Sequence, residues 1–272
     1  MLPSQPVTTL GGVKNACTAL AIGFALLLAA ERQLSADTIT FDFESGPGPG
    51  FSTTNSGNLW TLDTDGPTFQ ASKPADDGSF EPNGFIAGGI TSNFTMTGDF
   101  LVTVDFSILN FPAAGPAASA LNESVLGVSG DTAGESFLVL RFRHGSSDQI
   151  EAFGSSGGPT GVQNSSLTSG QYQIERVGDT LTGRFAPTGS ATFTTLGSFG
   201  GYTSPEFQIV LNGVQGTNAG GQPRSNTALD VAFDNLVVTA DGFVGTVPEP
   251  SSLALGGGGI LALFVWLRKR TR

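Results

Sequence analysis

The side chains that could carry out chemistry are few, and their positions restrict what they can do. His144 is the only histidine among the 272 residues, and Cys17 is the only cysteine. A Ser-His-Asp site would have to use His144, which lies at the end of a predicted strand directly before Gly145. We therefore expect His144 to be a structural or solvent-facing imidazole, and we expect no metal site built on histidine.

Carboxylates are plentiful, so glycoside hydrolysis has to be considered, because that reaction needs two acids in one cleft. The glucanase pattern is Glu-x-Asp-x-x-Glu on one strand, and no glutamate of this chain has an aspartate two residues later. Asp42 and Glu44 share one face of a predicted strand, but they are typical of the solvated side of an edge strand. We therefore predict that the protein is not an enzyme.

Two aspartate-rich turns could offer oxygen ligands to a hard cation such as calcium. Asp63 and Asp65 form the first turn, and residues 76–78 form the second. The first turn does not complete an EF-hand loop, because Thr61 stands where the opening aspartate should be and Ser72 stands at the glutamate position. We predict no cofactor, with calcium at Asp63 and Asp65 as the alternative to a plain Asp-Gly turn.

An exposed aromatic ring beside polar side chains is a common platform for a sugar. Between its two ends the chain offers Trp60, Tyr172 and Tyr202 for this role, because its phenylalanines lie mainly at core-facing spacing. Trp60, within residues 59–63, is the candidate glycan contact, and the same position also fits a residue of the core or of its rim.

The overall composition excludes several functional classes. The chain has 12 Lys and Arg against 23 Asp and Glu, a net charge of −11, which argues against nucleic acid as a partner because phosphate binding needs clustered cations. A single cysteine excludes an internal disulfide framework and multi-cysteine metal sites. The 39 glycines and the low charged fraction of 13% are typical of short strands joined by tight turns.

The elements that must hold these residues are predicted to be strands, because hydrophobic and polar residues alternate through the middle of the chain. Residues 100–108 show the clearest alternation. Residues 38–44 and 229–240 are amphipathic runs whose pairing would close the domain and hide two edges. Glycine and proline clusters separate the runs, and we predict one all-β, antiparallel β-sandwich of about 210 residues.

Local patterns predict further details of the sandwich. Gly178-Asp179 separates two alternating runs, as a two-residue type II′ hairpin turn requires. The hydrophobic phase shifts at Asp234-Asn235, which indicates a β-bulge. A further strand alternates hydrophobic and charged residues: Leu138, Leu140 and Phe142 oppose Arg141 and Arg143.

The first 36 residues are typical of a secretory signal peptide. Lys14 precedes an apolar stretch, residues 18–30, which has the length of a signal-peptide hydrophobic region and is short for a membrane span. Cleavage is predicted between Ala36 and Asp37, so that Cys17 would leave with the signal peptide.

The C-terminal segment combines three features. Pro248, Glu249 and Pro250 precede an apolar run, residues 253–267, and the chain then ends in a basic cluster: Arg268, Lys269, Arg270 and Arg272. An apolar run followed by cations is typical of a membrane helix whose basic end lies in the cytoplasm. Fifteen helical residues reach only ~22 Å, against ~30 Å for the hydrocarbon core, so the span would include preceding residues or serve as a transient stop.

This tail resembles the PEP-CTERM sorting signal of Gram-negative bacteria. The resemblance implies that an exosortase, a membrane enzyme with a cysteine nucleophile, recognises Pro248, Glu249 and Pro250. It also implies that residues 253–267 occupy the membrane during sorting and that the basic cluster retains them there. An ordinary C-terminal anchor is the alternative.

Residues 172–183 read YQIERVGDTLTG, and residues 193–196 contribute to a threonine-rich strand. This pattern resembles that of concanavalin A-like, or laminin-G-like, jelly rolls, and it implies a jelly-roll-like β-sandwich. An immunoglobulin-type sandwich is the alternative, although it would be shorter.

The sequence thus predicts three parts: a signal peptide (1–36), a β-sandwich domain (37–246), and a sorting signal with a single transmembrane helix (247–272). We predict a non-catalytic protein that is exported through the inner membrane, transiently anchored there, and then placed at the cell surface or in the extracellular matrix. Its expected partner is an exosortase. A polysaccharide-binding module is the first alternative, and a secreted carbohydrate-active enzyme is the second.

Overall fold

The computed structural model describes residues 36–44, 46–77, 79, 84–112, 120–132, 134–144, 147–155, 157–217 and 224–245. Strands dominate these residues. The strands are β1 (Asp37–Phe41), β2 (Phe51–Asn55), β3 (Thr61–Asp63), β4 (Phe69–Lys73), β5 (Ile86–Ser92), β6 (Phe94–Asn110), β7 (Ala120–Gly130), β8 (Ser136–His144), β9 (Ser147–Gly154), β10 (Gly158–Asn164), β11 (Ser169–Val177), β12 (Thr180–Pro187), β13 (Thr194–Phe199), β14 (Glu206–Thr217) and β15 (Leu229–Gly245). Two short 3₁₀ helices, η1 (Gly48–Gly50) and η2 (Ser56–Asn58), interrupt them.

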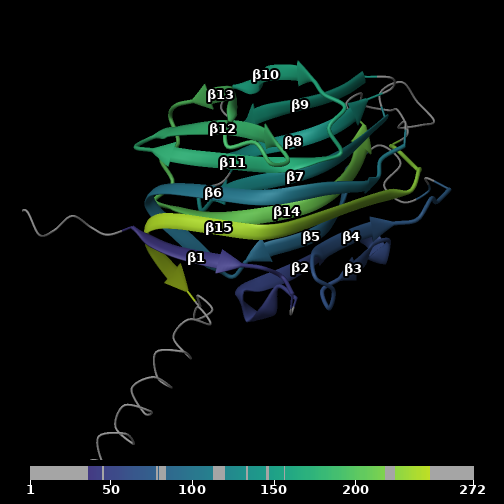
Figure 1. Ribbon diagram of the computed structural model, residues 1–272, viewed down its shortest axis with the longest axis horizontal. Helices are drawn as coiled ribbons and strands as arrows, with labels where there is room; N and C mark the ends of the chain where they lie inside the picture. The colour runs from purple at the N-terminus through teal and green to yellow at the C-terminus, as the bar shows by residue number, and fades with distance from the viewer. Residues whose placement is uncertain are drawn as a thin grey trace, which may run out of the picture. The chain divides into compact units, whose positions relative to one another are not determined.

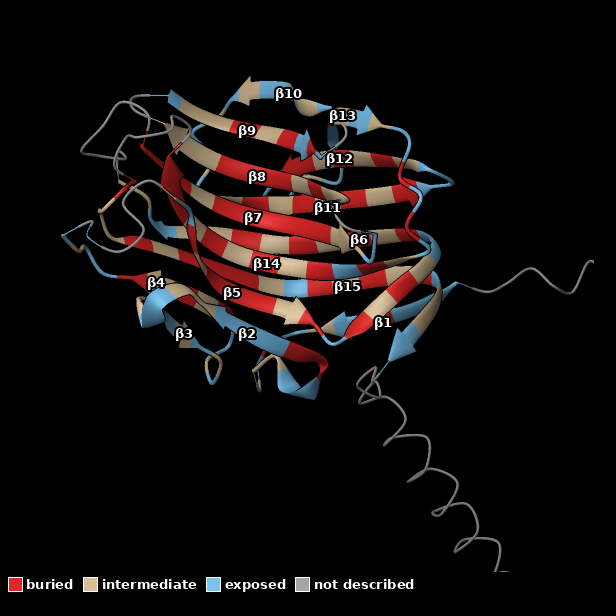
Figure 2. Ribbon diagram, turned by 180° about the vertical axis from the view of Figure 1, so that it is seen from behind, coloured by how far each residue is buried: buried red, intermediate tan, exposed pale blue. Residues whose placement is uncertain are grey.

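The strands form two packed layers (Figures 1 and 2). The first layer has the order β10-β9-β8-β7-β14-β5-β2, and the second has the order β13-β12-β11-β6-β15-β4-β3, with β1 also paired to β15. The layers are continuous where the start of β14 pairs with the start of β6, Glu206 opposite Thr97 and Phe207 opposite Met96. Every one of these strand pairs is antiparallel, which confirms the predicted fold class.

The core lies between the layers and takes alternate residues from each strand, because successive side chains of a strand point to opposite faces. Val102 and Val104 belong to β6 in the second layer, and Ile209 and Leu211 belong to β14 in the first. All four are fully buried members of one hydrophobic cluster. Buried residues therefore recur along the central strands (Figure 2).

The predicted hairpin and bulge are both present. β11 and β12 are joined by Gly178-Asp179, with Val177 opposite Thr180, and the positive φ of Gly178 (62°) fits the first position of a type II′ turn. The register of β15 on β6 shifts between Asp234 and Val237, where Asn235 has a φ of 48°. Asparagine tolerates this left-handed conformation better than most residues, so the bulge has a local cause.

The two ends of the domain pair as predicted, since β1 runs antiparallel to β15 with Ile39 opposite Val238. The predicted strand over residues 38–44 is too long, however, because β1 ends at Phe41. Phe43 has a φ of 53°, which leaves the extended conformation, although its ring is still buried in the core.

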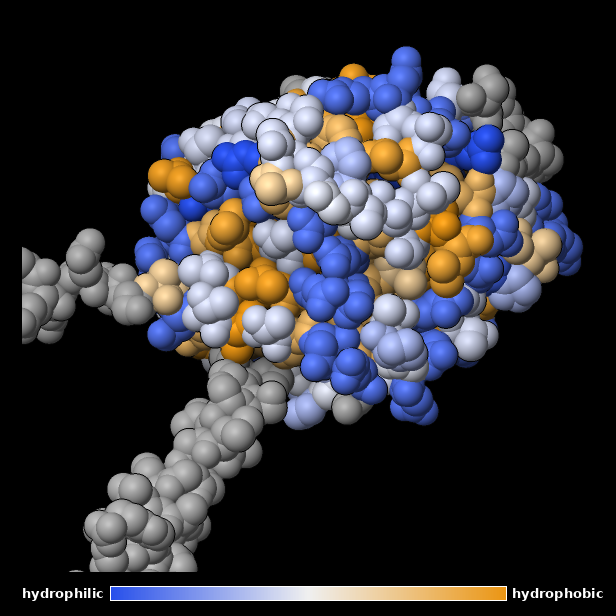
Figure 3. Space-filling view, viewed as in Figure 1, coloured by the Kyte–Doolittle hydropathy of each residue, from blue (hydrophilic) through white to orange (hydrophobic). Residues whose placement is uncertain are grey.

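The outer face of the second layer is polar. Gln171 of β11 donates a hydrogen bond to Asp105 of β6 at 2.7 Å, and Gln173 donates one to Thr103 at 3.2 Å. Seen from the side of Figure 1, the surface mixes hydrophilic and apolar side chains (Figure 3). Within the described residues, no helix has the length and hydropathy that crossing a membrane would require.

Candidate functional site

A groove of about 710 Å³ lies on the outer face of the first layer. It is built mainly from the outward-facing residues of β7, β8, β9 and β14, because the alternate residues of these strands, Val128 among them, fill the core. Most of its lining is apolar, contributed by Phe85, Leu121, Val125, Val128, Leu138, Leu140, Phe142, Phe153, Val210 and Val214. Its polar residues are Glu123, Ser129, Ser136, Glu151 and Asn212.

Strand β8 shows why apolar side chains lie on the outer face of the first layer. Hydrophobic and charged residues alternate along this strand, and the face that carries Arg141 points inward. The buried Arg141 guanidinium lies 3.1 Å from the Asp148 carboxylate and donates hydrogen bonds to the carbonyl oxygens of Leu167, Phe142 and Gln149. Because these partners satisfy the charge inside, the apolar residues on the opposite face of β8 are left to line the groove.

Two glutamates project into this apolar groove. Glu123 of β7 lies opposite Phe142 of β8 and Val214 of β14, and Glu151 of β9 lies opposite Leu140 of β8. Burial, together with the smaller effect of the nearby Glu151 charge, raises the pKa of Glu123 to about 8. Burial also raises the pKa of Glu151 to about 7. Among the described residues, neither carboxyl group has a hydrogen-bond or ion-pair partner.

Two aromatic rings at the groove are accessible to solvent. Phe153, two residues after Glu151 on the same face of β9, is 36% exposed. Phe85, just before β5, is 58% exposed, and its ring lies over Gly216 of β14, where an added Cβ would lie 2.2 Å from the ring. The groove therefore offers ring faces beside a carboxyl group, the combination that was sought at Trp60.

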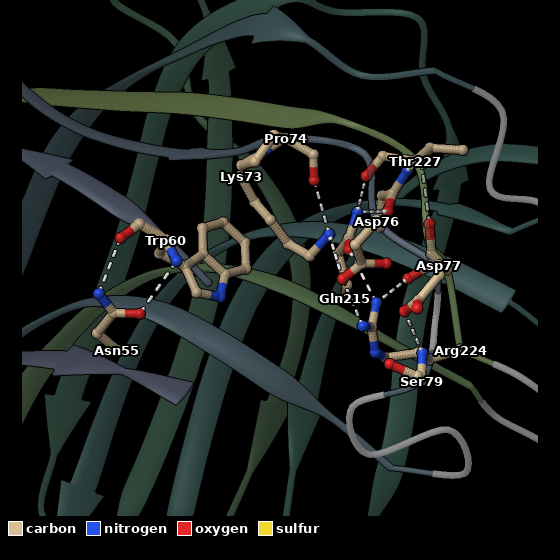
Figure 4. Close-up of polar contacts among 12 residues, drawn as sticks. Asn55, Trp60, Lys73, Pro74, Asp76, Asp77, Ser79, Gln215, Arg224 and Thr227 are labelled. Carbon is tan, nitrogen blue, oxygen red and sulfur yellow. Dashed lines mark hydrogen bonds and ion pairs between the residues drawn. The ribbon is translucent and has the colours of Figure 1, made fainter. Parts of the chain in front are cut away.

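The prediction of Trp60 as a glycan contact is wrong, because the Trp60 side chain is only 4% exposed and belongs to the core. Its indole packs on Gly88 of β5 and Gly213 of β14, which lie opposite each other across the two strands. Asn55 fixes the Trp60 backbone from both sides, at 3.0 Å to the amide and 2.8 Å to the carbonyl (Figure 4). A ring held in this way cannot stack on a sugar.

The two tyrosines weighed with Trp60 are also buried. Tyr172 stacks on Phe106 with ring centroids 4.0 Å apart, and its hydroxyl donates to the carbonyl of Ser124. Tyr202 packs against Phe137 and donates its hydroxyl to the carbonyl of Ser136. Both tyrosines thus bury their rings and satisfy their hydroxyls within the protein.

The proposed calcium turn closes on itself. The Asp63 carboxylate accepts a hydrogen bond from the Asp65 amide at 3.0 Å, the geometry of an Asx turn. Among the described residues, no group of three or more His, Cys, Asp or Glu side chains could hold a metal ion.

His144 is the last residue of β8, and its Nε2 is buried without a hydrogen-bond partner among the described residues.

The residues predicted for export and sorting lie mostly outside the described part of the chain. Ala36 and Asp37, the predicted cleavage pair, are exposed, and β1 begins at Asp37. The sorting motif Pro248, Glu249 and Pro250 and the basic cluster Arg268, Lys269, Arg270 and Arg272 lie outside the described residues.

Sequence reasoning missed a buried ionic cluster in which Asp76 holds two cations (Figure 4). The Asp76 Oδ2 atom lies 3.0 Å from Lys73 Nζ and 2.6 Å from Arg224 Nη2, and both cationic side chains are almost fully buried. Arg224 also donates to the carbonyl of Ser225, and Gln215 donates to the carbonyl of Thr227. Burial lowers the pKa of Lys73, and its hydrogen bond to Asp76 opposes this shift. Lys73 lies only three residues before Asp76, but Arg224 comes from a distant segment, so no local pattern reveals the cluster.

Comparison with known proteins identifies the tail and the fold. Residues 246–270 match the PEP-CTERM protein-sorting motif, in agreement with the resemblance seen in the sequence. No curated protein sequence matches the chain.

Solved structures with a similar fold are lectin-like jelly rolls of the concanavalin A-like type. A basic winged bean lectin with Tn-antigen is 11% identical over 78% of this chain and 100% of the lectin, with a TM-score of 0.53. The winged bean acidic lectin complexed with methyl-α-D-galactose is 11% identical over 75% of this chain and 98% of its own, with a TM-score of 0.52.

A third similar structure is described with the words "Prominent members of the human gut microbiota express endo-acting O-glycanases to initiate mucin breakdown". It is 14% identical over 74% of this chain and 98% of its own, with a TM-score of 0.54. At these identities the likeness shows the fold alone, and it confirms the predicted jelly-roll-like sandwich.

Proposed function

We propose that this protein is an exported, non-catalytic component of the cell surface or extracellular matrix that an exosortase sorts through its tail. The observation that carries the proposal is the PEP-CTERM motif at residues 246–270. It begins directly after the last strand, β15, which ends at Gly245. A predicted signal peptide before β1 supports the same route. The tail holds the chain at the inner membrane until the exosortase acts, and the β-sandwich is then released to the surface or the matrix.

Replacing Glu249 tests the sorting step. We expect Glu249→Ala to accumulate as a longer, membrane-bound precursor, because the variant lacks the one charged side chain of the Pro-Glu-Pro motif. Immunoblots of membrane and extracellular fractions would measure the shift. Ser252→Ala, outside the motif, is the matched control and should be processed normally. Normal processing of Glu249→Ala would contradict sorting through this motif.

Below neutral pH, the protonation of the two groove acids fits the non-catalytic part of the proposal. Glycoside hydrolysis commonly needs one carboxylate that is ionised while a second carboxylic acid donates a proton. Burial holds the pKa of Glu123 at about 8 and that of Glu151 at about 7, so below neutral pH both groups are mostly protonated. The two groups then act as neutral hydrogen-bonding residues of a binding surface.

Glycan binding is the second candidate function, and the observation that favours it is the placement of Phe153 beside Glu151 in the groove. An aromatic ring can pack on the apolar face of a sugar while a carboxyl group bonds its polar groups. The two winged bean lectins, described in complex with Tn-antigen and with methyl-α-D-galactose, share the fold.

Phe153→Ala tests this second function. On a glycan array, we expect the wild-type protein to bind a polysaccharide or oligosaccharide and to release no shorter product from it. We expect Phe153→Ala to weaken that binding about tenfold, because the stacking ring is lost. Leu109→Ala is the control, since Leu109 is also an exposed hydrophobic side chain but lies on β6, away from the groove. Absence of binding to any glycan would remove this candidate, and product release would overturn the non-catalytic role.

A further inference from the structure

The groove combines an apolar lining with two carboxyl groups, and no cationic side chain of the described residues lines it. Hydrophobic contact alone would accept many ligands, so it does not explain why two acids lie in this surface. Each acid costs free energy when it ionises in apolar surroundings, and its raised pKa reflects that cost. A positively charged group on the ligand would offset this free-energy cost by pairing with the ionised carboxylates.

The spacing of the two acids indicates an extended ligand. Glu123 and Glu151 lie on the two strands that flank β8, and their partners Phe142 and Leu140 are two residues apart along it. Neighbouring strands are about 4.8 Å apart, so the two backbones are separated by about 10 Å across the sheet. Amino groups on successive units of one extended chain could therefore reach both acids.

We infer that the groove binds an extracellular glycan whose sugar units carry free amino groups, an inference that rests on the glycan-binding role proposed above. The protonated amino groups donate hydrogen bonds to Glu123 and Glu151. The apolar C–H faces of the sugar rings pack on Phe142 and Phe153, and their hydroxyls face the open side of the groove. An acidic glycan would be repelled, and an N-acetylated one would leave both carboxyl groups without a charged partner.

Binding of such a glycan should release protons near neutral pH. A paired ammonium group stabilises the carboxylate form and lowers the pKa of Glu123 and Glu151 from their raised values. Within the lining these are the only ionisable side chains, since the residues from β8 and β14 do not ionise. Arg141 and Arg143 of β8 and Asp148 of β9 are also near along these strands, but they lie on the face opposite to the groove. His144, at the end of β8 opposite Leu121, is the next titratable residue on the groove's own face.

The test compares two ligands of the same backbone whose amino groups are free in one and N-acetylated in the other. Isothermal titration calorimetry would measure binding of the β-1,4-linked glucosamine tetramer and the N-acetylglucosamine tetramer to the full-length protein, in buffer near neutral pH, where both the amino groups and the two carboxyl groups can carry charge. We expect the glucosamine tetramer to bind about tenfold more tightly. Near neutral pH, repeating the titration in two buffers of different ionisation enthalpy should reveal net proton release.

Matched variants locate the effect. Glu151→Gln and Glu123→Gln should each reduce the preference to about threefold or less, because each removes one partner of the amino groups. Both should fold, since glutamine mimics the protonated carboxyl group that the groove favours. Glu44→Gln removes the same charge from an exposed site outside the groove and should keep the full preference.

Each outcome decides between the two proposals. Equal affinity for both tetramers, or a preference that all three variants reduce equally, would overturn the inference while leaving glycan binding in place. Failure of the glucosamine tetramer to bind, when the glycan array shows other ligands, would also overturn it. Failure to bind any glycan would remove the glycan-binding role itself. Sorting through the tail is tested separately, by the processing of Glu249→Ala.

Discussion

Replacing Asp76 with alanine is expected to lower the free energy of unfolding by about 3 kcal/mol, since it leaves two cations in a buried site without their shared carboxylate. Lys73 and Arg224 both contact the Oδ2 atom of Asp76, and each has at most 1% of its side chain exposed. Because both side chains are buried, solvent screens their charges poorly once Asp76 is gone. Chemical denaturation followed by circular dichroism would measure the change.

The next residue provides a matched control for this prediction. Asp77 is exposed and bonds only locally, accepting a hydrogen bond from the Ser79 amide at 2.9 Å. Asp77→Ala should change stability by no more than about 0.5 kcal/mol. A loss at Asp76 no larger than the loss at Asp77 would contradict the importance of the buried ionic cluster. Replacing Lys73 with methionine in the Asp76→Ala background should restore part of the loss, because one unpaired cation is then removed.

Trp60→Ala is expected to lower the free energy of unfolding by about 3 to 5 kcal/mol, the usual cost of removing a buried large aromatic side chain. The indole fills the slot above Gly88 and Gly213, so its loss would leave a cavity between the layers. Leu109→Ala, at a side chain 57% exposed, is the control and should have little effect. A small loss for Trp60→Ala would contradict the core position of the indole.

A double-mutant cycle tests the contact itself. A Cβ at Gly88 would lie 2.2 Å from the Trp60 ring, so Gly88→Ala alone should be strongly destabilising. In the Trp60→Ala background the clash is absent, and Gly88→Ala should cost much less. Additive effects of the two substitutions would show that the indole does not occupy this slot.

The fold could be predicted largely from the sequence because its determinants are local. Alternation defines the strands, Gly178 permits the hairpin turn, and Asn235 takes the left-handed conformation of the bulge. Pairing of the two ends followed from their amphipathic patterns. The strand starting at Asp37 was predicted too long, since the positive φ of Phe43 depends on contacts with the core that alternation does not encode.

The candidate site was harder to predict because alternation separates two faces of a strand without showing which one is inside. On β8 the charged Arg141 lies inward, since Asp148 and three carbonyl groups pair with its guanidinium. One signal of the groove was available in the sequence: Glu123 lies between Leu121 and Val125 on one face of its strand. An acid within an apolar face is unusual, and it marks a surface with a specific role.

The place of β15 in the sheet has a consequence for the timing of export. β15 is the last strand in the sequence, yet it pairs with β1, β4 and β6 and supplies Val231, Phe233 and Val238 to the core. A chain that crosses a membrane with its N-terminus first therefore delivers an interior strand of its second layer last. The sandwich cannot close until residue 245 has emerged, and the tail follows directly behind it. Completion of folding and arrival of the sorting motif thus coincide, so an enzyme that cuts near residue 249 would meet a domain that has just become able to fold.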